Sequence, residues 1–370
     1  MKVTFFTNSI GFAGAEKMMA FVANSLSERG HSVSVINFNS IGSYVNGYVQ
    51  SFRESITVYT YGGTETGEIR RLKLLRFAFK KSKFLKPDVL VSFTTFPNYV
   101  GKIIGTILHI PSIMSERGDP NVTINKKNLH SLLELCVINC SEGAVFQIQG
   151  ASEFFAKGLQ RRGIIIPNPI FVSERIEIAP TTNREKSIVS VGRLDNFQKR
   201  YDIMIKAFAI FSQSHPEYVL KLYGAGMDKD NIQRWAVEAS VGSKVKFMGL
   251  SNSPMRDICK DGIFLITSDF EGISNSLLEA MAIGLPCVST NSSPGGARMV
   301  ISNGKNGLLC PAGDALSIAG ALSRFADNPH MADMCGQNAK SVINRFDPTQ
   351  LIDRWESYIK QIVYEYNQKK

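Results

Sequence analysis

The chain has 370 residues, of which 44% are hydrophobic and 20% are charged, and its six cysteines include no Cys-x-x-Cys pair. This length favours two domains over a single core, and the composition excludes collagen-like repeats, a long disordered tail and a disulfide framework. No apolar run reaches the roughly 20 residues that a membrane span requires, and the N-terminal run is too short for a signal peptide. We therefore expect a cytoplasmic protein that at most lies against a membrane.

The formal net charge of +10 is concentrated in the first half of the chain. Residues 1–170 hold 19 Lys and Arg against 11 Asp and Glu, and within them residues 68–86 hold eight cations and one acid. A positive surface of this kind favours nucleic acid, anionic lipid or a phosphorylated substrate as a partner.

Short β-branched runs alternate with segments of helical period along this half. The runs predict strands at residues 3–6, 33–38, 56–59, 89–93 and 110–114, with helices between most of them, for example at 15–29 and 98–108. Apolar strands separated by helices are typical of a parallel sheet that is covered on both faces.

The alternation stops near residues 164–169, and a polar stretch follows at 173–186. Further strands are then predicted at 187–191, 219–223, 245–248, 263–267 and 287–289. We expect an α/β fold of two doubly wound parallel-sheet domains, residues 1–168 and 169–347, and an amphipathic helix at 348–368 that packs back on the first domain. Because open parallel sheets bind ligands at the carboxyl ends of their strands, the active site is expected in a cleft between the two facing domains.

The first motif of the second domain follows its first predicted strand. Gly192 and Arg193 come directly after the strand, and Lys199 lies six residues further on. A guanidinium fork and a point charge at the end of a strand suit a diphosphate. The alternative is a surface loop with solvated cations, and this loop alone does not decide between the two.

A short glycine motif, Gly224-Ala225-Gly226, follows the next predicted strand. It allows the backbone to approach a ligand closely, but it is also a common strand-to-helix turn. The full Gly-x-Gly-x-x-Gly pattern is missing here, which disfavours a dehydrogenase.

Two glutamates, Glu271 and Glu279, follow the predicted strand at 263–267. The first lies in the expected loop and the second in the first turn of the next helix, with the helix amides, a natural phosphate seat, between them. Such carboxylates can accept the hydroxyls of a sugar and of a ribose. The alternatives are a solvated loop acid for Glu271 and, for Glu279, the last residue of a capping box that begins at Ser276.

Two further motifs complete the pattern, Gly284-Leu285-Pro286 and Pro294-Gly295-Gly296. Over about residues 187–312 the chain resembles, in register, the retaining glycosyltransferases of family 4. That family has the GT-B fold of two facing Rossmann-like domains with an interdomain cleft. The resemblance is to bacterial enzymes that assemble lipid-linked, capsular or lipopolysaccharide oligosaccharides.

The resemblance implies that the second domain binds a nucleotide-sugar donor. Arg193 and Lys199 would neutralise the leaving diphosphate and Glu271 would hold the donor sugar, so these three would be the catalytic residues. Glu279 would bind the ribose. The implied donor-binding residues are Gly14, Gly192, Arg193, Lys199, Gly224, Gly226, Met248, Glu271, Ile273, Ser274, Asn275, Ser276 and Glu279.

The resemblance extends more weakly to the first domain, which it implies to be the acceptor-binding domain. The segment from Gly11 to Glu16 is similar to the family's glycine-rich loop. Arg117 lies in a segment that resembles the acceptor-side loop of oligosaccharide-assembly enzymes, at a position where many relatives have histidine. Gly11, Glu16 and Arg117 are therefore expected to contact the acceptor.

The basic segment at residues 68–86 has helical order. Its cations Lys73, Arg76, Lys80 and Lys83, here called the α-stripe, fall on one line of the expected helix, while apolar residues at 69, 72, 75 and 79 are expected on another face. Such a helix suits an anionic membrane surface, or the diphosphate of a polyprenyl-linked acceptor that the resemblance implies. The alternative is a solvated helix face.

The reaction that the resemblance implies is the transfer, with retention, of a hexose or N-acetylhexosamine from a UDP-sugar to a membrane-associated, polyprenyl-diphosphate-linked saccharide. Front-face attack requires no carboxylate nucleophile. No cofactor and no metal are expected, because Arg193 and Lys199 leave a divalent ion no role. The acids of Asp228-Lys229-Asp230 open a helix, where they suit its dipole. The expected location is the inner face of the cytoplasmic membrane.

Two other classes of function stay open. A nucleotide-sugar 2-epimerase of the same fold would act without an acceptor, and a non-catalytic membrane-binding or nucleic-acid-binding module would have no affinity for nucleoside diphosphates. Nucleic acid is not expected as a partner, since the first domain has no recognisable nucleic-acid motif. A glycosidase is disfavoured because it needs two opposed carboxylates.

Overall fold

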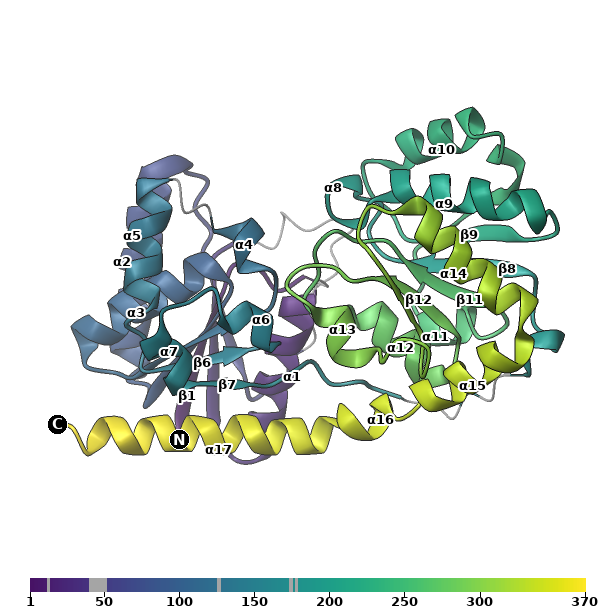
Figure 1. Ribbon diagram of the computed structural model, residues 1–370. Coiled ribbons are helices and arrows are strands. Elements are labelled where there is room, and N and C mark those ends of the chain that lie inside the picture. Colours follow the sequence, from purple (N-terminus) through teal and green to yellow (C-terminus); the bar gives the residue numbers. More distant parts are fainter. Residues whose placement is uncertain (12–13, 40–51, 125–127, 173–175, 177–178) are drawn as a thin grey trace. The chain divides into compact units, whose positions relative to one another are not determined.

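A computed structural model describes residues 1–11, 14–39, 52–124, 128–172, 176 and 179–370, and Figure 1 shows its ribbon. The chain forms two compact units. Unit 1 comprises Met1–Pro169 and Pro348–Lys370, and unit 2 comprises Ile170–Asp347.

Within the described residues, unit 1 is built on a seven-stranded parallel sheet in the order β3-β2-β1-β4-β5-β6-β7. Its strands are β1 (Lys2–Thr7), β2 (Ser32–Asn37), β3 (Thr57–Thr60), β4 (Val89–Phe93), β5 (Ser112–Glu116), β6 (Gly143–Phe146) and β7 (Gly163–Ile165). Its helices are α1 (Gly14–Glu28), α2 (Gly67–Leu85), α3 (Thr95–Leu108), α4 (Pro120–Thr123), α5 (Leu129–Ile138), α6 (Gln149–Ser152), α7 (Lys157–Arg162) and α17 (Pro348–Asn367).

Helices cover both faces of this sheet. Alternate residues of a strand point to opposite sides, and the central strands are apolar on both sides, so both faces need to be buried. On one face, Phe6 of β1 belongs to the apolar core that α2 and α3 complete. On the other face, Phe93 of β4 stacks on Trp355 of α17, with the ring centroids 5.8 Å apart. The hydroxyl of Tyr358, one turn further along α17, accepts a hydrogen bond of 2.8 Å from the amide of Ala144 in β6. The C-terminal helix is thus an integral part of unit 1.

Unit 2 contains, among its described residues, a six-stranded parallel sheet in the order β10-β9-β8-β11-β12-β13. Its strands are β8 (Ser187–Val191), β9 (Val219–Tyr223), β10 (Val245–Gly249), β11 (Ile263–Ile266), β12 (Cys287–Thr290) and β13 (Leu308–Cys310). Its α-helices are α8 (Asn196–Lys199), α9 (Tyr201–Ser214), α10 (Lys229–Glu238), α11 (Pro254–Asp257), α12 (Asn275–Ile283), α13 (Gly296–Val300), α14 (Ala315–Asp327), α15 (Pro329–Ala339) and α16 (Val342–Arg345).

The strand order of unit 2 reverses between β8 and β11. At such a switch point the loops that follow the two strands leave in opposite directions, which opens a crevice at the carboxyl ends of the strands. The loop after β8 carries Arg193 and the loop after β11 carries Glu271. The topology therefore brings together two motifs that are about 80 residues apart in the chain.

The predicted pair of doubly wound parallel sheets is confirmed. The predicted strands at 89–93, 187–191 and 219–223 coincide with β4, β8 and β9. Strands β6, β7 and β13 were not predicted, because each has only three or four residues and two of them begin at a glycine.

The predicted apolar face of α2 is partly wrong. Leu75 and Phe79 pack against the core as expected, but Ile69 and Leu72 are 63% and 67% exposed. They lie on the outer side of the helix with the α-stripe, while Leu74 faces the core. The reason is geometric, since residues 69, 72, 73, 76, 80 and 83 fall within about 100° around a helix of 3.6 residues per turn.

Candidate functional site

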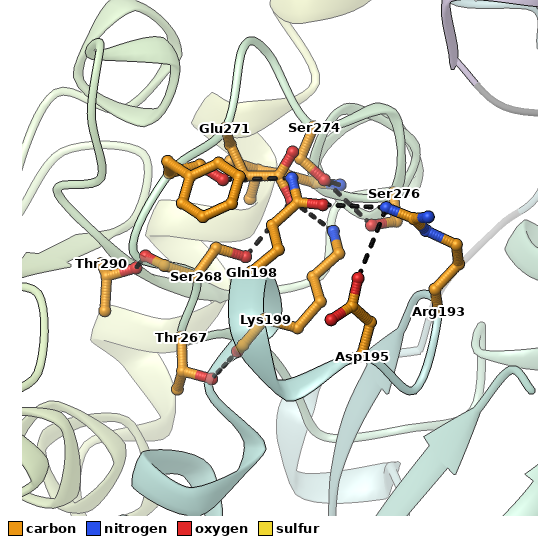
Figure 2. Close-up of polar contacts among 12 residues, drawn as sticks. Arg193, Asp195, Gln198, Lys199, Thr267, Ser268, Glu271, Ser274, Ser276 and Thr290 are labelled. Carbon is orange, nitrogen blue, oxygen red and sulfur yellow. Dashed lines mark hydrogen bonds and ion pairs between the residues drawn. The ribbon is translucent and has the colours of Figure 1, made fainter. Parts of the chain in front are cut away.

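The loops after β8 and β11 meet at the switch point of unit 2, and Figure 2 shows the polar contacts between them. The backbone amide of Asp269 donates to the carbonyl oxygen of Gln198 at 3.0 Å. The hydroxyl of Thr267 donates to the carbonyl oxygen of Lys199 at 2.8 Å. These bonds fix α8, which carries Lys199, against the loop that carries Glu271.

Glycines allow the loop after β8 to lie directly on the loop after β9. A Cβ at Gly224 would lie 1.9 Å from the carbonyl oxygen of Gly192, and a Cβ at Gly226 would lie 2.3 Å from that of Leu194. Gly224 also has a φ of +142°, which side chains rarely adopt. The structure thus gives both predicted donor-binding glycines of this motif a packing role between loops.

Acidic side chains shape the turn that presents Lys199. The Asp195 carboxylate caps α8 by accepting from the amide of Phe197 at 3.1 Å. Asp228 accepts from the amide of Asn196 at 2.8 Å, and this bond lowers the pKa of the Asp228 carboxyl. One carboxylate of the Asp-x-Asp sequence therefore holds the β8 loop in place.

Lys199 and Glu271 form an ion pair between Nζ and Oε1 at the centre of the site. Their side chains are only 16% and 13% exposed. The hydroxyl of Ser268 donates to the same carboxylate oxygen at 3.2 Å. Burial, and then the negative charge of Glu271, raise the pKa of the neighbouring Tyr201 phenol. The pair is thus a largely desolvated cation and anion in mutual contact.

Arg193 is the exposed cation of the site, with 69% of its side chain open to solvent. Its Nη2 donates to Oε1 of Gln198 at 3.1 Å and lies 3.7 Å from the Asp195 carboxylate. A third cation, Arg200, differs because its guanidinium is bound to Asp202 and Asp269. Of these three cations, Arg193 is the most exposed, while Lys199 and Arg200 are each paired with carboxylates.

Helix α12 begins at Asn275, four residues after Glu271. Ser274 is the N-cap and accepts from the amide of Leu277 at 3.4 Å, and its hydroxyl lies 3.0 Å from that of Ser276. Because the helix begins at Asn275, Glu279 is its fifth residue and cannot complete a capping box with Ser276. The capping-box alternative for Glu279 is therefore wrong.

The loop of Glu271 is also held by the segment after β12. The amide of Glu271 donates to the carbonyl oxygen of Ser293 at 2.7 Å, and Thr290 donates to the carbonyl oxygen of Ser268 at 2.6 Å. A Cβ at Gly296 would lie 1.5 Å from the carbonyl oxygen of Gly272. Gly296 of the Pro-Gly-Gly motif therefore permits close packing against Gly272, and this packing fixes the position of the loop that carries Glu271.

Two other predicted donor residues, Met248 and Ile273, lie in β10 and in the segment between β11 and α12. Met248, at the end of β10, is 45% exposed, and Ile273 is buried. Sequence reasoning missed Gln198 and Ser268, which both bond directly to residues that it did select. Gln198 directly precedes Lys199, and Ser268 lies two residues after the end of β11. These positions were the available signals, but neither glutamine nor serine is by itself diagnostic of a binding site.

The glycine-rich loop of unit 1 is described in part. Residues 12 and 13 lie outside the described ranges, while Gly14 begins α1 and Glu16 occupies its first turn. The Glu16 carboxylate accepts from the hydroxyl of Ser9. Acceptor contacts of Gly11 and Glu16, and donor contacts of Gly14, stay predictions.

The structure places Arg117 in the interior of unit 1, with an exposed fraction of 8%. Its Nη1 donates to the carbonyl oxygen of Ile166 at 2.7 Å. Its guanidinium carbon lies 5.9 and 5.6 Å from the ring centroids of Phe93 and Trp355. Burial lowers the pKa of Arg117 to about 9, against the opposing charge of Glu116. Arg117 is part of the unit 1 core, and its contact with an acceptor stays a prediction.

The α-stripe is exposed along α2. Lys73 pairs with Glu65, and both this ion pair and the Tyr61 hydroxyl lower the pKa of Glu65 to about 2.

In the part of the chain that the structure describes, no group of three or more His, Cys, Asp or Glu residues is placed to hold a metal ion.

The chain is similar to known glycosyltransferases. Residues 173–342 match the family described as glycosyl transferases group 1. The chain is 25% identical over 368 residues to the N-acetylgalactosamine-N,N'-diacetylbacillosaminyl-diphospho-undecaprenol 4-alpha-N-acetylgalactosaminyltransferase of Campylobacter jejuni, covering 95% of this chain and 97% of that protein. It is 23% identical over 337 residues to the lipopolysaccharide 1,6-galactosyltransferase of Escherichia coli, covering 88% and 89%.

A solved structure shows the same fold over almost the whole chain. Anabaena HepE in complex with UDP-glucose superposes with a TM-score of 0.80 at 18% identity, covering 98% of this chain and 100% of that one.

Proposed function

We propose that this chain, a glycosyltransferase whose residues 173–342 match the glycosyl transferases group 1 family, transfers a sugar, with retention, from a UDP-sugar to a polyprenyl-diphosphate-linked saccharide. The predicted resemblance and the predicted GT-B fold are confirmed. The enzyme class and its place among bacterial enzymes of lipopolysaccharide and lipid-linked saccharide assembly follow from the relatives. The donor, the acceptor and the stereochemistry belong to the proposal.

The observation that carries the proposal is the meeting of Arg193, Lys199 and the N-terminus of α12 at the switch point of unit 2. As the donor sugar departs from its diphosphate, negative charge grows on the phosphate oxygens. Two cations and the amides of a helix N-terminus are suited to that charge. Each preorganised donor of this kind contributes roughly 3–4 kcal/mol to the transition state.

We assign the donor sugar to Glu271 and the ribose to Glu279. Glu271 lies beside Lys199, so a carboxylate that accepts sugar hydroxyls would stand next to the cation that receives the phosphate. Glu279 is the fifth residue of α12, is half-buried and lies eight residues after Glu271. Because Glu271 is paired with Lys199, we propose that it does not act as a nucleophile. In the proposed front-face mechanism, the acceptor hydroxyl attacks from the side on which the diphosphate leaves, and the leaving phosphate takes its proton.

The identity of the donor is proposed from the relatives. HepE binds UDP-glucose, and the Campylobacter relative is an N-acetylgalactosaminyltransferase. We therefore propose a UDP-hexose or UDP-N-acetylhexosamine. Arg193 and Lys199 supply two positive charges to the diphosphate in the proposed site, and we propose that transfer needs no metal ion.

The acceptor is proposed to be presented at a membrane surface. The outer side of α2 combines the α-stripe with the exposed side chains of Ile69, Leu72 and Phe84. Cations interspersed with apolar side chains suit the headgroup region of an anionic bilayer. Among the described helices, none is both long and apolar enough to cross a membrane. We propose peripheral binding at the inner face of the cytoplasmic membrane.

The neighbouring helix α5 extends this surface. Arg71 of α2 binds Glu134 of α5 at 3.0 Å, and α5 exposes Leu129 and Leu133, at 72% and 57%. An exposed apolar group of this kind on a globular protein is typical of an interaction surface. The two helices together would rest on the lipid.

Two assays test the proposed function. We expect UDP to raise the melting temperature more than GDP or ADP does, since stabilisation follows nucleotide binding. We then expect radiolabelled sugar to pass from the matching UDP-sugar to a polyprenyl-diphosphate saccharide but not to water alone at a comparable rate. A protein that binds UDP but converts the donor to an epimer without any acceptor would support the epimerase alternative instead. A protein that binds none of the three nucleotides would contradict the proposal.

A further inference from the structure

The side chain of Gln198 connects the two loops that form the donor site. Its Oε1 accepts a hydrogen bond from Nη2 of Arg193 at 3.1 Å, and its Nε2 donates to the carbonyl oxygen of Phe270 at 3.1 Å. Figure 2 shows Gln198 between Arg193 and Glu271. The amide thus uses its acceptor on one loop and its donor on the other.

The backbone of Gln198 belongs to the rigid part of the site. Its carbonyl oxygen accepts from the amide of Asp269 at 3.0 Å. The rings of Phe197 and Phe270, one on each loop, lie edge to face with centroids 5.4 Å apart. Both loops therefore set the position of the Gln198 side-chain carboxamide, which can act as a fixed anchor for the Arg193 guanidinium.

Arg193 needs such an anchor because most of its side chain is exposed. A free arginine side chain has about 2 kcal/mol of rotamer entropy to lose when it binds. Its other contact, with Asp195 at 3.7 Å, is a solvent-exposed ion pair, and such pairs contribute little. The hydrogen bond to Gln198 is the contact that directs the guanidinium toward the Glu271 side of the site.

We propose that Gln198 is a positioning residue that holds the Arg193 guanidinium at a fixed distance from the loop of Glu271. The diphosphate and the donor sugar would then be bound at the separation that the scissile bond requires. This inference rests on the proposed function, in which Arg193 binds the diphosphate and Glu271 binds the sugar.

The residue type fits this role. An uncharged amide accepts from Arg193 and donates to Phe270 without adding negative charge beside the phosphates. Methionine has nearly the same shape but neither hydrogen-bonding group. The substitution Gln198→Met therefore removes both contacts and leaves the packing of the loop largely intact.

The test is a double-mutant cycle on Gln198 and Arg193, with UDP and the donor sugar nucleotide as ligands. We expect Gln198→Met to raise the dissociation constant for UDP about 3- to 10-fold, as for the loss of one hydrogen bond of ordinary strength to a largely exposed side chain, and to lower kcat further. In an Arg193→Ala background the same substitution should change the dissociation constant less than twofold, because its partner is gone. The control is Gln337→Met, the same change at an exposed position of α15 in unit 2.

Each result distinguishes this inference from the proposed function. If the wild type and the Arg193→Ala variant differ in UDP affinity but Gln198→Met behaves like the wild type, the positioning role is wrong and the proposed function stands. An effect of Gln198→Met that persists undiminished without Arg193 would show a general structural role, and would also overturn the inference. If the wild type binds no nucleoside diphosphate, the proposed function fails and this inference with it.

Discussion

The ion pair between Lys199 and Glu271 makes Lys199→Met the most informative single change. In the structure the lysine neutralises a carboxylate in a largely desolvated site, with both side chains less than one-fifth exposed. Methionine keeps most of the apolar stem and removes the charge. The variant should therefore lose the contact with the diphosphate. Among the described residues, the Glu271 carboxylate would then keep the Ser268 hydroxyl as its hydrogen-bond donor.

The size of the effect follows from these two losses. A hydrogen bond to a charged group contributes about 1.5–3 kcal/mol, which corresponds to roughly 10- to 150-fold weaker binding of UDP. The uncompensated Glu271 carboxylate would repel the phosphates and move the result toward the upper end. Adding Glu271→Gln to the same chain removes this repulsion, so the double variant should bind UDP more tightly than Lys199→Met alone.

Isothermal titration calorimetry with UDP measures both changes directly. Lys206→Met, at an exposed position of α9 in the same unit, is the matched control and should bind UDP like the wild type. A dissociation constant for Lys199→Met within twofold of the wild-type value would refute the reasoning. So would a double variant that binds UDP no better than Lys199→Met.

Three further predictions follow from the same structure. Glu279→Ala should weaken UDP binding by about 10-fold in calorimetry, as for one lost charged hydrogen bond, whereas Glu271→Ala should mainly lower kcat; a Glu279→Ala variant that changes only the melting temperature would contradict the ribose assignment. Replacing the four cations of the α-stripe by Gln should reduce binding to anionic vesicles and transfer to lipid-linked acceptors while donor hydrolysis is spared; equal loss of both activities would argue against a membrane role. Glu356 in α17 has a pKa lowered to about 2, chiefly by Lys360 and then by Arg29, so its stabilisation is present above its ordinary pKa of 4.5 and is lost as the pH falls toward 2. The melting temperature of Glu356→Gln should therefore lie below that of the wild type at pH 7 and converge with it near pH 2, and a constant difference across this range would contradict the assignment.

The sequence predicted those parts of the fold that depend on local pattern. Strands β4 and β8 are apolar runs between clear breaks, and their predicted bounds agree with the structure. Strand β7 has only three residues, begins at a glycine and directly follows α7. A strand of this kind is defined by its pairing with β6, and that pairing is a tertiary contact that no local pattern reveals.

The candidate site shows the same division between local and tertiary information. Arg193, Lys199 and Glu271 were selected because they follow predicted strands in motifs that resemble those of the family, and the structure brings them to the same switch point. Gln198 could not be selected in this way, because its function depends on contacts with two loops. The burial of Arg117 was equally inaccessible, since it depends on Trp355, which lies far along the chain.

The capping of α12 shows why even a correct local motif can be assigned to the wrong residue. Ser274 and Ser276 are both good N-cap residues, and the sequence pattern favoured Ser276 because Glu279 follows three positions later. The backbone begins the helix at Asn275, so Ser274 is the cap. The difference of two residues moves Glu279 from the helix terminus into the body of α12.

A crystal structure of the protein with a bound UDP-sugar tests the central claim most directly. The account predicts the diphosphate at the N-terminus of α12, with its oxygens about 3 Å from the Lys199 ammonium and from the Arg193 guanidinium. The donor sugar should lie against the Glu271 carboxylate. A nucleotide bound elsewhere on the chain, or one that leaves Lys199 in contact with Glu271 alone, would contradict it.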